Sequence, residues 1–319
     1  MWGDGCAMCP LRCKVPFMRR DGPLGPKVGE FRHDSAGGWS QNVLLKGGFD
    51  TQTYLSPYVD NLGMDNEDVS GVVAWMMECY DRGLITKEDL GGIDLTWGNL
   101  EAICQLLERI VKREGIGDTL AEGLKFAPPK IGKGTEKYAM HSKGVAITSY
   151  ELRGRLSDAV SMVVNACGGL HADRGGPLRI IADCLTICNF HRGPLTDVFG
   201  SFPDWGVEML NAVCGWNITK QDWDDFTSRA HFMERCYAIR DGYLPSRDDT
   251  IPDRFFDETI YHKYGQPMKL DRKEFLEQRR ILYEAYGLNQ DGIPPQASLK
   301  KLGLDFVIPT LEKVIGRWT

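Results

Sequence analysis

The sequence of 319 residues lacks several features that mark large classes of protein. No apolar run reaches the roughly 20 residues of a membrane-spanning helix, and the N-terminus lacks the apolar core of a signal peptide. The chain carries 38 Lys and Arg against 44 Asp and Glu, a net charge of −6. Because phosphate binding needs a basic face, this balance argues against nucleic acid as a partner. We expect a cytoplasmic protein with no membrane span.

Common catalytic signatures are also missing. The sequence has no Gly-rich loop followed by Lys and Ser or Thr, which would bind phosphates, and no Gly-x-Ser-x-Gly nucleophile elbow. It also lacks a strong alternation of apolar and polar residues, the pattern of a half-buried strand. These absences leave a mainly α fold as the expectation.

Apolar periodicity predicts several helices with capping side chains at their starts. Asp65, Asn99 and Thr219 each precede an apolar stripe with helical spacing. Further helices are expected over 151–165 and 272–286. The Gly-rich and Pro-rich stretch 14–48 is typical of a loop.

Ten cysteines are present, and three of them, Cys6, Cys9 and Cys13, have C-x₂-C-x₃-C spacing. Iron–sulfur clusters are held by four Cys thiolates, typically a short run plus a distant residue, whereas structural zinc favours two separated pairs. The spacing therefore favours a [4Fe–4S] cluster, with zinc and unliganded thiols as alternatives. The other seven cysteines lie singly in apolar segments, which is typical of reduced core thiols.

Two short segments echo each other at a distance in the chain. Asp60 lies five residues before Asp65, and Asp183 lies five residues before Cys188. This correspondence makes Cys188 the candidate for the distant fourth thiolate.

Glycine pairs at 168–169 and 175–176 flank His171. Paired glycines mark close backbone approach to another element or to a ligand, so His171 is a candidate functional residue, with a structural histidine as the alternative. Lys143, which precedes Gly144, is a candidate for receiving an anionic group or an ordinary surface residue.

Taken together, these motifs resemble the tungsten- or molybdenum-pterin aldehyde ferredoxin oxidoreductase family, specifically its two helical C-terminal domains. The matching pieces are the cysteine run, Asp60 to Asp65, Gly83-Leu84-Ile85-Thr86, the stretch 91–99, His141-x-Lys143-Gly144, Asp183 to Cys188 and Gly292-Ile293-Pro294. They occur in the family's order over essentially the whole chain.

The resemblance implies a mainly α fold of two helical domains packed around a bis-pterin and iron–sulfur site. We place the first domain, with the cluster loop and pterin segments, at residues 1–190 and the helical C-terminal region at residues 191–319. The family's N-terminal β-rich domain, which covers the other face of the pterin, is expected as a separate piece or subunit.

The resemblance also implies roles for individual residues. The [4Fe–4S] ligands would be Cys6, Cys9, Cys13 and Cys188. The pterin contacts would be Asp60, Gly63, Asp65, Asp183, Ile187, Cys188 and Lys143. One departure is Thr186, which stands where the family has Gly in the second segment.

Three further residues resemble the acid–base groups near the metal. His171 is similar in context to the family's histidine, and Glu30 and His33 lie in the loop after the thiols. An imidazole and a carboxylate beside a redox metal can move protons while the metal takes electrons.

The activity that the resemblance implies is oxidation of an aldehyde and water to a carboxylic acid, with electrons leaving through the cluster to ferredoxin or a ferredoxin-like subunit. One alternative is a reductive tungsten enzyme of the family acting on an aryl-CoA thioester. The other is a non-catalytic iron–sulfur or zinc subunit, an electron relay or structural protein, in which the two Asp segments are ordinary helix caps. Further expected partners are the N-terminal domain or subunit, a small aldehyde or related carbonyl substrate, and a second copy of the chain in a homo-oligomer.

Overall fold

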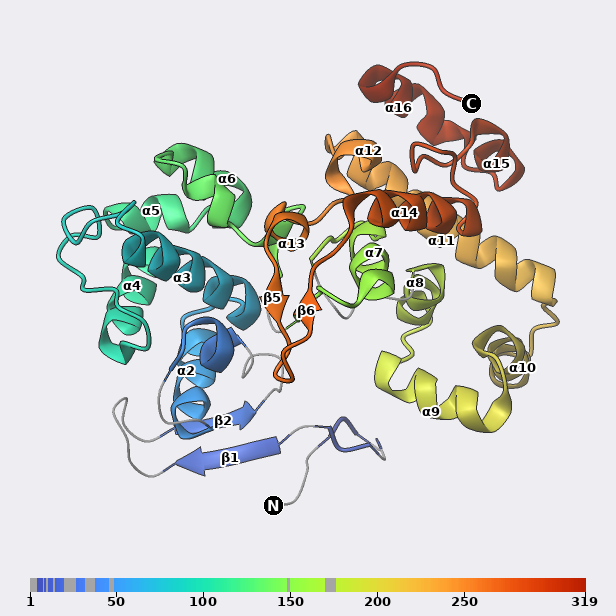
Figure 1. The fold of residues 1–319 in the computed structure, drawn as a ribbon. Helices are drawn as coiled ribbons and strands as arrows, with labels where there is room; N and C mark the ends of the chain where they lie inside the picture. Colours follow the sequence, from blue (N-terminus) through green and yellow to red (C-terminus); the bar gives the residue numbers. More distant parts are fainter. Residues whose placement is uncertain are drawn as a thin grey trace. The chain divides into compact units, whose positions relative to one another are not determined.

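The computed structural model describes residues 5–7, 9, 11–13, 15–19, 27–31, 38–45, 49–147, 150–169 and 176–319. Helices dominate, as predicted, and the described strands form three two-stranded antiparallel hairpins (Figure 1). No helix in these ranges is both long enough and apolar enough to cross a membrane. The chain divides into two compact units, Met1–Glu151 with Ile251–Thr259, and Leu152–Thr250 with Ile260–Thr319.

The elements of the first unit include helix α3, whose buried residues lie in the core of the unit. They are β1 (Val15–Arg19), β2 (Lys27–Phe31), the π-helix η1 (Gly38–Asn42), α2 (Phe49–Asn61), α3 (Asn66–Asp81), α4 (Leu100–Lys112), α5 (Ile116–Leu120), α6 (Gly123–Ile131), the 3₁₀ helix η2 (Thr135–Tyr138), β3 (His141–Ser142), β4 (Val145–Ala146) and α13 (Arg254–Asp257).

Two of the predicted caps begin helices of this unit. The Asp65 carboxylate accepts hydrogen bonds from the first backbone N–H groups of α3, and the Asn99 side chain does the same for α4. The apolar stripes of the two helices then meet in one core, which includes Val73, Met76, Leu106 and other residues with almost no exposed surface. Burial of these stripes stabilises both helices far more than their intrinsic propensity does.

The β1–β2 hairpin is a correction to the sequence interpretation, which predicted a loop over 14–48. Val15 pairs with Phe31 at one end of the ladder and Arg19 with Lys27 at the other. The hairpin packs on α2, where a Cβ at Gly29 would approach the side chain of Pro57 to 2.9 Å. Packing against a helix stabilises two strands whose own sequence carries little strand signal.

The second unit contains most of the longer C-terminal helices. Its elements are α7 (Leu156–Val164), α8 (Gly176–Cys184), α9 (Asn189–Phe199), α10 (Phe202–Cys214), α11 (Lys220–Arg240), α12 (Pro245–Asp248), β5 (Ile260–Tyr261), β6 (Pro267–Met268), α14 (Arg272–Ala285), α15 (Gln296–Lys301), the 3₁₀ helix η4 (Asp305–Val307) and α16 (Ile308–Ile315).

Helix α11 is the longest described element, and it organises this unit. Its predicted cap, Thr219, forms a reciprocal capping box with Asp222. Helices α8, α10 and α16 pack against α11, while α7 packs against α14. Because α7 and α8 belong to this assembly, the boundary lies after residue 151, whereas the sequence suggested residue 190.

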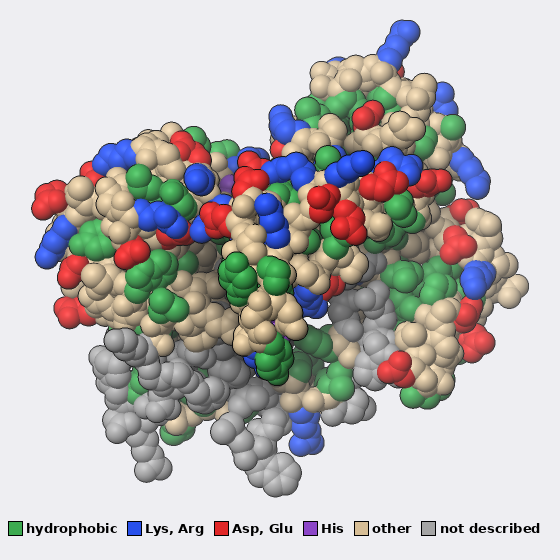
Figure 2. Space-filling model, viewed as in Figure 1, with side chains coloured by type: hydrophobic (Ala, Val, Ile, Leu, Met, Phe, Trp, Pro, Cys, Tyr) green, Lys and Arg blue, Asp and Glu red, His purple; other side chains and the backbone are tan. Residues whose placement is uncertain are grey.

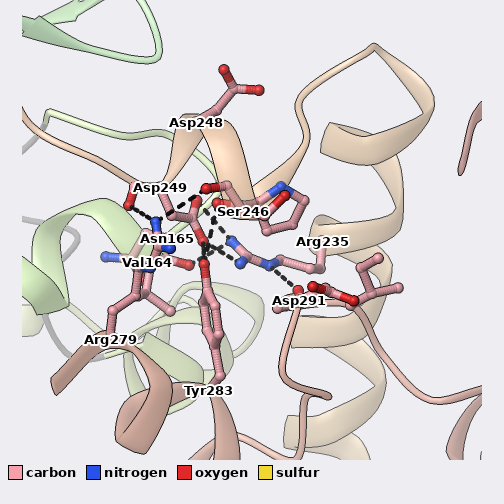
Figure 3. A network of polar contacts seen from close by, with 12 residues as sticks. Val164, Asn165, Arg235, Ser246, Asp248, Asp249, Arg279, Tyr283 and Asp291 are labelled. Carbon is pink, nitrogen blue, oxygen red and sulfur yellow. Dashed lines mark hydrogen bonds and ion pairs between the residues drawn. The ribbon is translucent and has the colours of Figure 1, made fainter. Parts of the chain in front are cut away.

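A buried polar network lies at the centre of the second unit (Figure 3). The Arg235 guanidinium forms an ion pair with Asp249, and it donates hydrogen bonds of 2.7 Å to the Val164 carbonyl and 3.0 Å to the Gly292 carbonyl. The Tyr283 hydroxyl donates to the Asp249 carboxylate at 2.7 Å. The network joins the C-terminal end of α7 to α11, α14 and the chain on either side of α14.

The surface visible in Figure 2 carries basic and acidic side chains close to one another on each unit. In the first unit, Lys133 pairs with Asp89 at 2.8 Å. In the second unit, Arg280 pairs with Glu277 at 2.8 Å. Exposed pairs of this kind contribute at most about 1 kcal/mol each.

Candidate functional site

The first Asp segment joins the end of α2 to the start of α3 through a Schellman turn. The Gly63 N–H donates to the Asp60 carbonyl at 3.0 Å, and the Met64 N–H donates to the Val59 carbonyl at 3.3 Å. Gly63 has φ of +74°, the left-handed conformation that this turn requires. Asp65 follows as the N-cap of α3.

The second segment has the same backbone hydrogen bonds between α8 and α9. The Thr186 N–H donates to the Asp183 carbonyl at 3.0 Å, and the Ile187 N–H donates to the Ala182 carbonyl at 2.8 Å. Cys188 then stands at the N-cap of α9. The repeat seen in the sequence is therefore a repeated structure, a Schellman turn followed at once by a new helix.

Thr186 also adopts the left-handed conformation, with φ of +56°. Its place in the turn matches that of Gly63, so the backbone geometry is kept despite the departure from Gly. A β-branched residue is strained at such a φ.

The carboxylates of Asp60 and Asp65 in the first segment are exposed, and each accepts hydrogen bonds through only one of its two oxygens in the part of the chain that the structure describes. Asp60 Oδ1 accepts a hydrogen bond of 2.7 Å from the side chain of Asn66. Asp65 Oδ1 accepts both capping bonds, from the N–H groups of Glu67 at 2.9 Å and Asp68 at 2.8 Å. Within the described residues, the second carboxylate oxygen of each Asp accepts no hydrogen bond, and it can accept one from a ligand.

A pocket of about 400 Å³ borders this segment and is lined in part by Gly63, Asp65 and Asp68. The space beside Gly63 is open, since a Cβ there would meet no atom within 4 Å. Asp68 faces the β3–β4 hairpin, and its Oδ1 accepts the Ala146 N–H at 2.7 Å. Burial, opposed by this hydrogen bond, raises the pKa of the Asp68 carboxyl above its usual range.

Lys143 lies in the tight turn of the β3–β4 hairpin, with φ of +55°. The ring of His141 stabilises the turn, because its Nδ1 accepts the Gly144 N–H at 3.2 Å. Burial, helped by the charge of Lys125, lowers the pKa of His141, so this imidazole is neutral at pH 7. The hairpin, with Lys143 at its turn, packs on α3 and α6.

The three N-terminal thiols lie on one loop before β1. Cys6 and Cys13 are exposed and Cys9 is partly buried, and none of them forms a disulfide. The Cys9 N–H donates to the Cys6 carbonyl at 2.9 Å, which closes a turn between these two ligand candidates. Among the described residues, no three His, Cys, Asp or Glu side chains already converge on one point suited to a metal ion.

Cys188 and Asp183 are both exposed in the second unit. Unlike the Asp65 carboxylate, the Cys188 thiol makes no hydrogen bond to the backbone N–H groups at the start of α9. Asp183 forms an ion pair of 3.0 Å with Arg179, one turn earlier in α8. Ile187 is half-buried and packs against the small core of α8 and α10.

The predicted acid–base residues are described only in part. Glu30 is in β2, opposite Pro16 of β1. His33 and His171 lie outside the described residues. The chain before His171 is anchored through the bond from Arg235 to Val164, and α8 begins after it at Gly176.

The sequence interpretation missed Asn66 as a polar partner of Asp60. The sequence does contain a signal for this residue, because the two Asp segments share the same residue type at the next position as well. Asn66 follows Asp65, and Asn189 follows Cys188.

Comparison with known proteins places these features in a family. Residues 2–179 and 176–304 match the family described as aldehyde ferredoxin oxidoreductase, domains 2 & 3. The aliphatic sulfonate oxidoreductase, WOR-like subunit, of Pyrococcus furiosus is 32% identical over an alignment 319 positions long, which covers 93% of this chain and 49% of that protein. The tungsten-containing aldehyde ferredoxin oxidoreductase of Pyrococcus horikoshii is 28% identical over an alignment 338 positions long, which covers 94% of this chain and 52% of that protein. The chain thus spans about half the length of these curated relatives.

A solved structure shares the fold. It is the active-site complex BamBC of benzoyl coenzyme A reductase in complex with 1,5 dienoyl-CoA, with a TM-score of 0.72 and 19% identity. The match covers 98% of this chain and 54% of that chain, and identity this low shows the fold alone. Because the family match extends over nearly the whole sequence, the chain belongs to the aldehyde ferredoxin oxidoreductase family and corresponds to its domains 2 and 3.

Proposed function

We propose that this chain is the pterin- and cluster-binding part of a tungsten or molybdenum oxidoreductase that converts aldehydes to carboxylic acids. The observation that carries the proposal is the position of Asp60 and Asp183. Each lies in the last turn of a helix, α2 or α8. A carboxylate there faces the negative end of the helix dipole, which costs about 0.3–1 kcal/mol.

That cost favours the proposal over the non-catalytic alternative, in which the two Asp segments are ordinary helix caps. A helix cap explains Asp65, which stabilises the positive N-terminal end of α3. It does not explain Asp60 or Asp183, because a carboxylate at a helix C-terminus opposes the helix. The presence of both carboxylates at the same position of the repeated turn supports a role in binding a ligand with N–H groups.

The donor and acceptor groups of the chain fit a pterin. Amino and ring N–H groups of a pterin need acceptors, and the unused carboxylate oxygens of Asp60 and Asp65 supply them. The open space beside Gly63 allows a flat ring system to approach the backbone. In the second segment, the exposed Asp183 carboxylate and the Ile187 backbone would contact the pterin in the same way. Lys143, in the turn of the β3–β4 hairpin, would bind an anionic group of the cofactor.

The thiols fit an iron–sulfur cluster. Cys6, Cys9, Cys13 and Cys188 are free of disulfides, and all but the partly buried Cys9 are exposed. Four thiolates from a short run and a distant residue are the usual ligand set of a [4Fe–4S] cluster.

When bound, the metal-pterin group would supply the two-electron oxidation of the carbonyl substrate, and the cluster would pass electrons on singly. His171, with Glu30 and His33, would hold and move the protons. A ferredoxin or ferredoxin-like subunit is the proposed electron acceptor. The family's N-terminal domain or subunit would complete the pterin site.

Anaerobic purification followed by metal and pterin analysis tests the proposal. The chain should be produced with tungstate and molybdate, alone and with the polypeptide encoded beside it. We expect about four iron atoms, and one tungsten or molybdenum with pterin, per complete site. The variant Cys13→Ser should lose iron, whereas Cys214→Ser, at an exposed thiol that ends α10, should keep it.

The same measurements can contradict the proposal. Iron or zinc without tungsten, molybdenum or pterin in both preparations would support the relay subunit instead. If the metal and pterin are present, turnover with aldehydes and with aryl-CoA thioesters decides between the oxidative and reductive alternatives.

A further inference from the structure

Asn66 is the first residue of α3 and its side chain is buried, with 7% of its surface exposed. Its amide makes three hydrogen bonds. Oδ1 accepts the indole N–H of Trp39 at 2.9 Å, and Nδ2 donates to the Ser56 carbonyl at 3.2 Å and to Asp60 Oδ1 at 2.7 Å. A buried amide with one acceptor bond and two donor bonds is well satisfied.

Trp39 determines which way this amide points. An indole N–H is only a donor, so it requires the oxygen of the Asn66 amide and excludes the opposite orientation. With Oδ1 fixed on Trp39, the amide nitrogen must point toward Ser56 and Asp60. The orientation of the Asp60 carboxylate is therefore set by a side chain that a ligand cannot reach.

Trp39 is itself rigidly held. It belongs to η1 and has no exposed surface. The preceding Gly38 lies against α3 so closely that a Cβ there would approach Ser70 Oγ to 2.3 Å. π-Helices such as η1 are rare and are found frequently at functional sites.

We propose that Asn66 is a positioning residue for cofactor binding, which holds Asp60 Oδ1 so that Oδ2 is presented to an N–H edge of the pterin. The inference rests on the proposed function. Asn66 would not contact the cofactor, and it would act by removing the rotational freedom of the exposed Asp60 side chain before binding. Outer hydrogen-bond partners of this kind orient the groups that make direct contact.

The sequence places an Asn in the same register of the second segment. Asn189 is the first residue of α9 and directly follows Cys188, as Asn66 directly follows Asp65. The two turns have matching backbone hydrogen bonds. The position after the N-cap is thus occupied by the same residue type in both halves of the repeat.

The test compares Asn66→Asp with Asn99→Asp. The first keeps the acceptor for Trp39, removes the donor to Asp60 and places a second carboxylate against it. The control changes an Asn at the start of α4, where the side chain accepts the Ala102 N–H and donates to the Asp94 carbonyl at 3.1 Å. Both variants lose an amide donor and gain one negative charge.

The measurements are pterin and iron content after anaerobic purification with the partner polypeptide, and crystal structures of the cofactor-free variants. For Asn66→Asp we expect about 10-fold less bound pterin, unchanged iron and an Asp60 side chain that has left its rotamer. Asn99→Asp should match the unmodified protein in all three. A retained fold in both variants would be checked by the near-ultraviolet circular dichroism of their tryptophans.

Full pterin content in Asn66→Asp would overturn the inference, and so would an unmoved Asp60. If the unmodified protein contains no pterin, the proposed function itself fails, and the role of Asn66 toward a pterin fails with it. Loss of pterin together with iron would show a general folding defect and would also overturn a positioning role.

Discussion

At the scale of single residues, the two Asp segments differ most at their left-handed positions. Gly63 occupies this conformation without strain, whereas Thr186 occupies it with a β-branched side chain. The side chain of Thr186 is exposed, so packing does not compensate for the strain. The difference gives a reciprocal pair of predictions.

Thr186→Gly should stabilise the second unit by about 1 kcal/mol, because relief of the left-handed strain outweighs the added flexibility of the unfolded chain. Gly63→Thr should destabilise the first unit by about 1–2 kcal/mol, through backbone strain alone, since its Cβ meets no neighbour. Denaturant unfolding measures both changes. A less stable Thr186→Gly variant would show that the threonine side chain makes a favourable contact.

His231 gives the protein a predictable sensitivity to acid. Its ring is 3% exposed, lies 5.4 Å from the ring of Tyr286, and has no hydrogen-bond partner for Nδ1 within the described residues. Burial and the nearby Arg235 lower its pKa to about 3, and the Asp249 carboxylate opposes this only in part.

Because the pKa of His231 in the folded protein lies below the ordinary value near 6.5, its contribution to stability is complete above pH 6.5. That contribution is lost as the pH falls from 6.5 toward 3, with a slope of at most about 1.4 kcal/mol per pH unit. His231→Leu should flatten the dependence of the unfolding free energy on pH between 6 and 4. An unchanged slope would assign the acid sensitivity to other groups.

At the scale of elements, the Arg235 network shows how one side chain connects parts of the chain that are distant in sequence. Arg235 of α11 contacts the carboxylate of Asp249, the end of α7 and the turn at Gly292 (Figure 3). The ring of Tyr283 lies 5.5 Å from its guanidinium carbon, and its hydroxyl adds a hydrogen bond to Asp249. Desolvation of the hydroxyl, together with the Asp249 charge, raises the pKa of Tyr283 well above its usual range, so it remains a donor.

Arg235→Met should cost about 3–5 kcal/mol of unfolding free energy, since it removes the cation that is paired with the buried Asp249 carboxylate. It also removes the donor to the Val164 and Gly292 carbonyls. Arg280→Met is the matched control, because its ion pair with Glu277 is about half exposed and should change stability by less than about 1 kcal/mol. Equal effects of the two substitutions in urea unfolding would contradict this interpretation.

At the scale of the whole molecule, the chain consists of two compact helical units that each carry one Asp segment. The first unit contains the cysteine run and the Asp60 segment, and the second contains Asp183 and Cys188. The family match likewise spans both.

The sequence was sufficient to predict features that depend on local patterns. The starts of α3, α4 and α11 followed from Asp65, Asn99 and Thr219, because a capping side chain bonds to backbone groups within three residues. The correspondence of the two Asp segments also followed, because a Schellman turn and the following cap are set by a few consecutive residues.

Features that depend on distant residues needed the tertiary structure. The β1–β2 hairpin is stabilised by packing on α2, and the division after residue 151 reflects how α7 and α8 pack within the second unit. The proposed role of Asn66 depends on its hydrogen bond with Trp39, 27 residues away, and Arg235 donates a hydrogen bond to Val164, 71 residues away. The sequence alone therefore determined the starts of α3, α4 and α11, the thiol run and the correspondence of the two Asp segments, because the causes of these features are local. Only the tertiary structure decided which buried polar groups meet, because that depends on how the helices pack.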